Sequence, residues 1–202
     1  MTATAATAAI AIDPTRLATI TAETYIAMVE SGALIDRRVE LIAGKLVDMS
    51  PISNPHAAGV NILADIFRDG RSARVEIRTE QHVDLSPLNS MPEPDLAVCS
   101  WRADRYGVTA PGVADIHLIV EVALSSLPYD RTTKRELYEL AGIPEYWIVN
   151  LRDRQIEQFV PDAEGKYPKD GEVFAEGTRF SHALMGEIVV AEVLPMTGEA
   201  SA

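Results

Sequence analysis

The sequence feature that most constrains the fold is an apolar run at residues 116–124 that one glutamate interrupts. A run this short and this apolar predicts a buried central β-strand. The interrupting residue is Glu121, and burial of a lone carboxylate costs several kcal/mol. Glu121 should therefore have a cation, a proton or a hydrogen-bond partner. A purely structural ion pair with an arginine fits this pattern equally well.

A helix and a second strand are predicted directly after this run. Asp130 can cap a helix that continues to about Ala141, where Gly142 and Pro144 follow as C-terminal signals. Residues 146–149 are typical of the next strand. The order strand, helix, strand predicts a βαβ crossover.

Lys134 is expected on the inward face of this helix. It shares helical spacing with Leu137, Tyr138 and Ala141, which form the face that should pack on the sheet. From there its ammonium group can reach toward Glu121. A lysine that directs its charged end to the rim of the protein would give the same pattern.

The rest of the chain predicts a single α/β domain, with no internal repeat or heptad. We expect a loose tail at residues 1–20, the domain at 21–195 and a short tail at 196–202. The other expected elements are a helix at 22–30 with Thr21 as its cap, a hairpin at 38–48, a helix from 54 to about 71, and strands at 75–85, 95–99, 155–160, 166–174 and 187–193.

Charge and cysteine content exclude several classes of protein. The chain has 18 Lys and Arg against 30 Asp and Glu, a formal net charge of -12, which excludes a polybasic nucleic-acid binder. Contact with DNA then needs a local basic patch or divalent cations. The single cysteine, Cys99, excludes an internal disulfide and a cysteine-rich zinc site, and it suits the cytoplasm. No apolar run approaches a membrane span of about 18 residues, so we expect no membrane partner.

Two further carboxylates are candidates for a site. Asp95 follows the stiff loop Pro92-Glu93-Pro94 at the start of a short strand, where an aspartate that only shapes a turn is also typical. Glu40 lies in the predicted hairpin at 38–48. The pattern of its neighbours does not decide whether its side chain points to solvent or inward.

Four blocks of the sequence resemble the bacterial Uma-two family, a group of restriction-endonuclease-like proteins in the PD-(D/E)XK nuclease superfamily. The blocks are V-E-L-I-A-G-K-L-V-D-M-S-P at 39–51, P-E-P-D-L-A-V at 92–98, I-V-E-V-A at 119–123 and Y-D-R-T-T-K-R-E-L-Y-E-L-A-G-I-P-E-Y-W-I-V at 129–149. The resemblance spans residues 21–194. It implies a restriction-endonuclease-like α/β (α+β) fold, with a central mixed β-sheet flanked by helices and extra β-hairpins.

The resemblance also assigns catalytic residues. Asp95 matches the aspartate of the P-D element, and Glu121 matches the acidic residue of the (D/E)XK element. Ala123 stands where the superfamily usually has its lysine, and Lys134 matches a lysine that this family carries on the following helix. Glu40 matches an acidic residue from the early part of the fold.

The same resemblance implies a Mg²⁺ or Mn²⁺ site. Asp95, Glu121 and the backbone carbonyl of Val122 would hold the metal, and Glu40 would bind a second ion or orient water. His56 matches a histidine often found after the S-P segment, and no role can be assigned to it from the sequence.

The implied function is a metal-dependent endonuclease that hydrolyses DNA phosphodiester bonds. Two alternatives stay open: an inactive nuclease-like interaction module, which could be a homodimer, and a metal-dependent hydrolase of a smaller phosphoester. Convergence of Glu40, Asp95, Glu121 and Lys134 around a space for a cation would separate the enzymes from the module. The candidates for contact with DNA phosphates are Arg37, Arg38, Lys45, Arg68, Arg71, Arg74, Arg78, Arg102 and Arg105.

Overall fold

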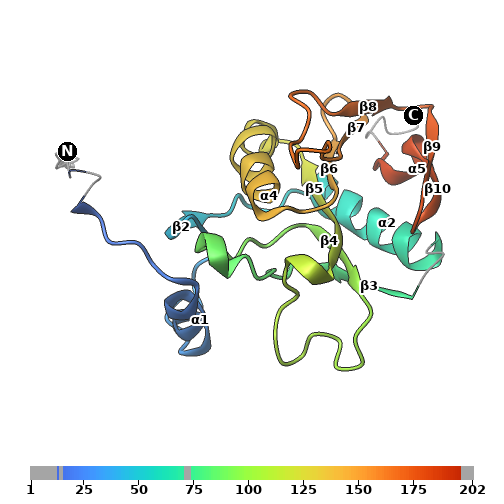
Figure 1. Cartoon of the computed structure of the whole chain (residues 1–202). Helices are drawn as coiled ribbons and strands as arrows, with labels where there is room; N and C mark the ends of the chain where they lie inside the picture. The colour runs from blue at the N-terminus through green and yellow to red at the C-terminus, as the bar shows by residue number, and fades with distance from the viewer. Residues whose placement is uncertain (1–12, 14–15, 71–73, 197–202) are drawn as a thin grey trace, which may run out of the picture.

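The computed structural model describes residues 13, 16–70 and 74–196, so most of both predicted tails lies outside the described residues. In this part of the chain the main sheet has six strands in the order β3-β4-β5-β6-β7-β8, and only β5 and β6 run parallel (Figure 1). The strands are β3 (Val75–Thr79), β4 (Leu96–Ser100), β5 (Ile116–Ala123), β6 (Tyr146–Asn150), β7 (Gln155–Phe159) and β8 (Glu172–Ala175). The mixed sheet confirms the predicted fold class.

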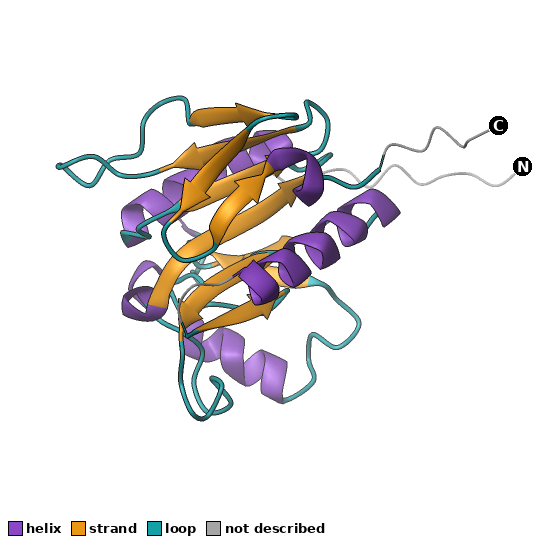
Figure 2. Ribbon diagram, turned by 90° about the vertical axis from the view of Figure 1, so that its right-hand side faces the viewer, coloured by secondary structure: helices purple, strands orange, loops and turns teal. Residues whose placement is uncertain are grey.

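Helices lie on both faces of this sheet, and two antiparallel hairpins stand beside it (Figure 2). The hairpins pair β1 (Val39–Ile42) with β2 (Lys45–Asp48) and β9 (Arg179–His182) with β10 (Gly186–Val189). The helices are α1 (Ala22–Glu30), α2 (Asn54–Gly70), α3 (Leu127–Tyr129), α4 (Arg135–Ala141) and α5 (Val190–Val193), and a π-helical turn at Asp130–Lys134 joins α3 to α4.

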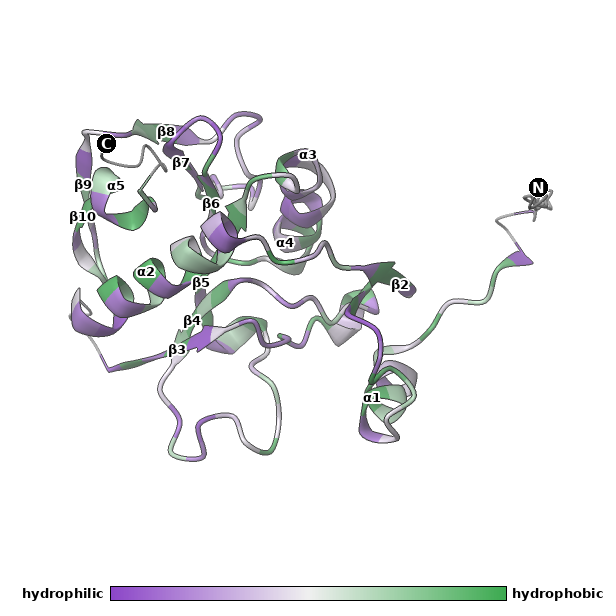
Figure 3. Ribbon diagram, turned by 180° about the vertical axis from the view of Figure 1, so that it is seen from behind, coloured by the Kyte–Doolittle hydropathy of each residue, from purple (hydrophilic) through white to green (hydrophobic). Residues whose placement is uncertain are grey.

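The alternation of side chains along β5 divides the core into two layers. Leu118, Val120 and Val122 pack on the side of α2 and α5, whereas Ile119 and Ala123 pack on the side of α4. Hydrophobic and hydrophilic segments alternate along α2 in Figure 3, as an amphipathic helix on a sheet requires. Glu121 is in phase with the α4 layer, so the fold directs it toward the helix that carries Lys134.

A close approach of α2 to β5 depends on Gly59. A Cβ atom at this position would lie 3.0 Å from Val122 Cγ1. Gly59→Leu should therefore lower the free energy of unfolding by about 1–3 kcal/mol through overpacking. Urea denaturation would measure this change, with Asn61→Leu on the exposed face of the same helix as the control. Equal stability of the two variants would contradict the close packing.

Several predicted elements are confirmed. The buried strand β5 leads through a helical segment into the parallel strand β6, which is the predicted βαβ crossover. Thr21 caps α1 by accepting a hydrogen bond from Thr24 N. The turn between β1 and β2 lies at Ala43 and Gly44, both with positive φ, as a tight hairpin requires.

Other predicted boundaries were wrong. The strand predicted at 75–85 ends at Thr79, because Glu80 adopts a φ of 50° that breaks the extended backbone. The strand predicted at 166–174 is mostly a loop, in which Pro168 has no N–H to donate and Tyr167 N donates to the Glu139 side chain. The strand predicted at 187–193 is confirmed only as far as Val189, where β10 ends. Residues 190–193 form helix α5 instead, which buries Val190 and Val193 three residues apart.

The start of the α4 segment also differs from the prediction. Helical backbone begins at Leu127, so Asp130 lies inside the helical segment and does not cap it. Gly142, in the left-handed conformation, ends α4 as predicted. Asp130 is one of the two buried residues of the π-helical turn, so its carboxylate is free for a part other than capping.

Candidate active site

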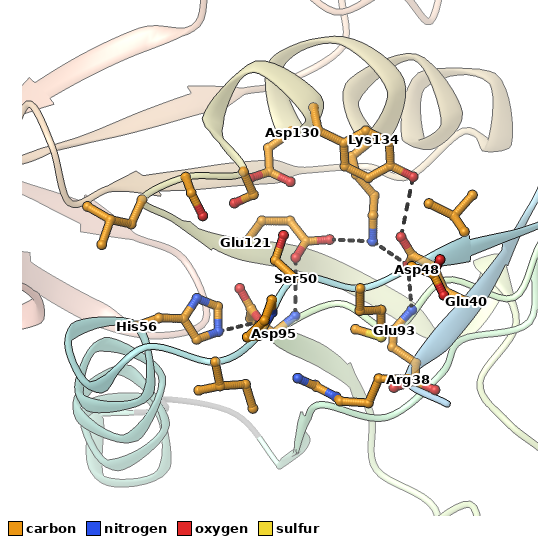
Figure 4. Close-up of a pocket in the computed structure, with 18 of the residues that line it drawn as sticks. Arg38, Glu40, Asp48, Ser50, His56, Glu93, Asp95, Glu121, Asp130 and Lys134 are labelled. Atoms are coloured by element: carbon orange, nitrogen blue, oxygen red, sulfur yellow. Dashed lines mark hydrogen bonds and ion pairs between the residues drawn. The ribbon is translucent and has the colours of Figure 1, made fainter. Parts of the chain in front are cut away.

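A pocket of about 270 Å³ opens where the β1–β2 hairpin, the start of β4, the end of β5 and the π-helical turn meet (Figure 4). Every charged residue that the sequence singled out as catalytic lines it: Glu40, Asp95, Glu121 and Lys134. The other charged or polar side chains of its lining are Arg38, Asp48, Ser50, Ser53, His56, Glu93, Ser125, Ser126, Tyr129 and Asp130.

Lys134 forms the centre of a buried ion cluster. Its Nζ lies 2.6 Å from Glu40 Oε2 and 3.1 Å from Glu121 Oε1, and all three side chains are at most 7% exposed. An ammonium group has three N–H donors, and these two contacts use two of them. The third N–H has no hydrogen-bond partner among the described residues.

Tyr138, one turn further along the helix, holds the cluster from the core side. Its hydroxyl donates to Glu121 Oε1 at 2.7 Å. Lys134 and Tyr138 share the inward face that the spacing predicted, so the helix presents two donors to the same carboxylate. Burial raises the pKa of Tyr138 well above its ordinary value, which keeps the hydroxyl a donor.

The electrostatics of the cluster follow from burial and from opposite charge. Burial raises the pKa of Glu121, against the opposing attraction of Lys134. Burial alone would lower the pKa of Lys134, but attraction to Glu121 and Glu40 outweighs it and raises that pKa. The lysine therefore stays charged at neutral pH, and the carboxylates compete for its charge.

Asp95 is fixed beside Glu121 by the antiparallel pairing of β4 and β5. Leu96 is opposite Val120 in the register, which brings the residue before β4 next to the end of β5. Val122 N donates to Asp95 Oδ2 at 2.7 Å, and Asp95 N donates to Glu121 Oε2 at 3.3 Å. The two carboxylates thus meet at one end of the sheet.

Glu40 points inward, which resolves the alternative that the sequence left open. Its carboxylate accepts hydrogen bonds from Glu93 N at 3.2 Å and Tyr129 Oη at 3.4 Å, in addition to the contact with Lys134. All four residues of β1 are buried, on both sides of the strand. A strand buried on both faces shows no alternation, so the sequence pattern could not reveal the direction of Glu40.

His56, on the first turn of α2, joins Asp95 to β5. Its Nε2 lies 3.0 Å from Asp95 Oδ1, and its Nδ1 lies 2.9 Å from the carbonyl oxygen of Val122. Both contacts need an N–H, and only the protonated imidazole has two. The hydrogen bond to Asp95 raises the pKa of His56, against the burial that lowers it.

This contact predicts a pH-dependent contribution to stability in the metal-free protein. A raised pKa in the folded state means that His56 stabilises the fold below the unfolded pKa of about 6.5 and loses this effect as the pH rises through the folded value. His56→Ala should cost about 1.5–3 kcal/mol at pH 5.5, the usual range for a charged hydrogen bond, and less at pH 9.

Chemical denaturation in EDTA at several pH values would measure the effect. His82→Ala is the matched control, because burial lowers the pKa of His82 and the pH trend of its variant should be reversed. The same trend for both variants would contradict the assignment of charge to His56.

The donor atoms in the pocket fit a hard divalent cation. Asp95, Glu121 and the Val122 carbonyl offer oxygen, which Mg²⁺ and Mn²⁺ prefer. Asp130 is 3% exposed, and its Oδ2 has no hydrogen-bond partner among the described residues. A buried carboxylate oxygen without a partner is expected where a cation or water binds. His56 contacts Asp95 Oδ1 and the Val122 carbonyl oxygen, so these two atoms would be open to a cation only after its ring moved.

No group of three or more His, Cys, Asp or Glu side chains within 16–70 and 74–196 is placed to hold a metal ion. The ligands predicted for the first ion include only two such side chains, Asp95 and Glu121, besides the Val122 carbonyl. Glu40 is predicted to bind a second ion or to orient water. The sequence missed Asp130, Tyr129 and Glu93 as pocket residues. Glu93 is the one with a signal, since it lies between two prolines directly before Asp95.

The predicted phosphate contacts do not gather at this pocket. Of the described members of that set, only Arg38 lines it. Arg37, Arg102 and Arg105 form ion pairs with Asp48, Asp104 and Glu76, and Arg74 lies over the Trp101 ring. Arg71 lies outside the described residues. The pocket itself carries six carboxylates against Arg38, Lys134 and His56.

Comparison with known proteins gives one family and one fold. The model of the family described as "Putative restriction endonuclease", Uma2, matches residues 23–191. A crystal structure described as a "putative nuclease belonging to DUF820", from Anabaena variabilis ATCC 29413, is 14% identical in sequence. The similarity covers 77% of this chain and 88% of that chain with a TM-score of 0.58, which shows a shared fold. No curated protein matches the chain.

Proposed function

Because this chain belongs to the Uma2 family, the Uma-two family that its sequence blocks resemble, we propose that it is a metal-dependent endonuclease that hydrolyses DNA phosphodiester bonds. The family supports a nuclease-like function. The observation that carries the finer proposal is the buried contact of Lys134 with Glu40 and Glu121 in the pocket that Asp95 also lines.

Burial of a lysine among carboxylates costs free energy, because the charged groups lose their contact with water. The stability of the fold does not require such an arrangement. Replacement of buried ion pairs by well-packed apolar residues is often neutral or stabilising. Perturbed carboxylates in an open pocket are instead typical of sites that bind or transform a ligand. The clustering of costly groups in this pocket therefore favours chemistry over an interaction module.

Each residue has a distinct part in the proposed reaction. Asp95, Glu121 and the Val122 carbonyl would hold Mg²⁺ or Mn²⁺, and Glu40 would bind a second ion or orient water. A bound divalent cation neutralises phosphate charge and lowers the pKa of water. Lys134 would direct its third N–H toward the attacking water or a phosphate oxygen, where negative charge develops. Tyr138 would hold Glu121 in position.

Binding of DNA would depend on the cations, because the pocket is acidic. Without them its six carboxylates repel phosphate, so we expect weak, salt-sensitive binding in EDTA. Among the helices in the described part of the chain, none combines the length and apolar character needed to cross a bilayer. The homodimer stays a prediction that light scattering after size-exclusion chromatography would check.

The test is cleavage with purified full-length protein. Supercoiled plasmid, single- and double-stranded oligonucleotides and bis(p-nitrophenyl) phosphate would be incubated with Mg²⁺, with Mn²⁺ and with EDTA. The proposal expects nicked or linear DNA with metal and none in EDTA. Turnover of the small ester alone would favour a small-phosphoester hydrolase. No turnover of any substrate would favour the inactive interaction module.

A further inference from the structure

Asp130 is the buried charged residue of the pocket that the proposed reaction leaves unused. It is 3% exposed and lines the pocket between the end of β5 and α4. Figure 4 shows its side chain directed toward the same space as Glu121. Its Oδ2 has no hydrogen-bond partner within residues 16–70 and 74–196. Such an orphaned carboxylate oxygen needs an explanation, because burial of a polar atom without a hydrogen bond costs free energy.

The local backbone holds Asp130 in this place. The turn Asp130–Lys134 is π-helical, a conformation often found at functional sites. Its two end residues are buried at the pocket, whereas Arg131 and Thr132 are exposed. Tyr146 Oη donates to the Asp130 carbonyl oxygen at 3.2 Å, which anchors the turn to β6. One turn therefore supplies both Lys134 and a second, oppositely charged group to the pocket.

The surroundings of Asp130 indicate which partner its free oxygen would take. Glu40, Asp95 and Glu121 line the same pocket as Asp130, so four carboxylates share one space. Repulsion among several carboxylates is relieved by a divalent cation bound between them. A hard oxygen next to Asp95 and Glu121 extends a ligand set of the kind that Mg²⁺ and Mn²⁺ prefer.

We propose that Asp130 is a further ligand for the divalent cation of this pocket, through its unpartnered Oδ2. This inference rests on the proposed function, because it takes the ion from that proposal. It adds a residue from the π-helical turn to a set that otherwise comes from β5 and the start of β4. Within residues 16–70 and 74–196 no three acidic side chains are already placed around one point, so the ion would have to draw these carboxylates together. The turn then links the metal to Lys134, so ion binding and the position of the ammonium group are coupled.

Titration calorimetry with Mn²⁺ alone tests the assignment without any need for activity. Wild type, Asp130→Asn and Asp104→Asn would be titrated after removal of metal with EDTA. Asp104 is the matched control, since it pairs with Arg102 outside the pocket. We expect Asp130→Asn to weaken Mn²⁺ binding by about 10–100-fold. Substitution of a residue that only supports a metal ligand already lowers metal affinity by this factor. Asp104→Asn should bind as wild type does.

Thermal unfolding with and without Mn²⁺ provides the second measurement. The rise in unfolding temperature that Mn²⁺ gives to wild type should shrink in Asp130→Asn, while the metal-free variant still unfolds cooperatively. If Asp130→Asn does not fold, Asp130→Ser replaces it in both measurements. Wild-type affinity in the Asp130 variant would overturn the inference and leave the proposed function standing. Absence of Mn²⁺ binding by wild type would overturn both.

Discussion

Lys134→Met is expected to lower the free energy of unfolding by about 3–5 kcal/mol in EDTA at neutral pH, because it leaves buried carboxylates without their cation. Glu40 and Glu121 are both at most 7% exposed and share the one ammonium group. Loss of a buried partner costs far more than loss of a surface one. The isosteric apolar stem of methionine keeps the packing, so the change measures charge rather than volume.

Two further variants show whether charge is the cause. Lys166→Met breaks an ion pair with Glu139 of nearly the same length, 3.2 Å, on a side chain that is 58% exposed. It should cost at most about 1 kcal/mol. The triple variant Glu40→Gln, Glu121→Gln, Lys134→Met should recover most of the lost stability and have no cleavage activity. Equal stability of the two single lysine variants, or no recovery in the triple variant, would contradict the buried ion cluster.

Asp95→Asn and Glu121→Gln should each reduce the rate of Mg²⁺-dependent DNA cleavage by about 10²–10³-fold, the usual cost of removing a preorganised electrostatic group. Both substitutions keep the shape of the side chain and remove only the charge that would hold the ion. The measurement is the single-turnover rate on a labelled duplex. A thermal melt of each variant would confirm that it is folded.

Asp104→Asn is the control for this pair, since it removes a carboxylate from a surface loop. Its cleavage rate should match that of wild type. The two groups of variants therefore separate a general loss of acidic charge from a loss at the pocket. Wild-type rates for both Asp95→Asn and Glu121→Gln would show that any nuclease activity resides elsewhere in the molecule.

The parts of the site that the sequence predicted are those where a charge interrupts an apolar pattern. Glu121 stands inside a run that must be buried, and Lys134 shares helical phase with Leu137 and Tyr138. Each conflict between pattern and charge identified a residue that the structure buries. The resemblance to the Uma-two family, confirmed by the match over 23–191, added Asp95 and Glu40, whose own patterns were ambiguous.

The errors and omissions have different causes. Asp130 has the residue type of a helix cap, and nothing in the sequence reveals that helical backbone begins three residues earlier at Leu127. The contacts of His56 with Asp95 and Val122 join segments far apart in the chain, which no local pattern records. The segment predicted as a strand at 166–174 is mostly a loop, because Pro168 cannot donate a hydrogen bond to a neighbouring strand.

The pocket accounts for part of the net charge of -12. Six carboxylates lie around one cavity, so part of the acidic excess is concentrated where the cation would bind. Of the basic residues that could contact DNA, Arg68, Arg74 and Arg105 line a different hollow, and most members of the set form ion pairs. We therefore expect metal, rather than a basic surface, to govern any association with DNA.

The central claim is tested most directly by the crystal structure of the protein with Mn²⁺ and a nuclease-resistant DNA oligonucleotide, measured for anomalous scattering. The account predicts a Mn²⁺ peak in contact with Asp95, Glu121 and the Val122 carbonyl oxygen, with a DNA phosphate beside it and the His56 ring displaced. A pocket without Mn²⁺ at saturating concentration, with the DNA bound elsewhere or absent, would contradict it.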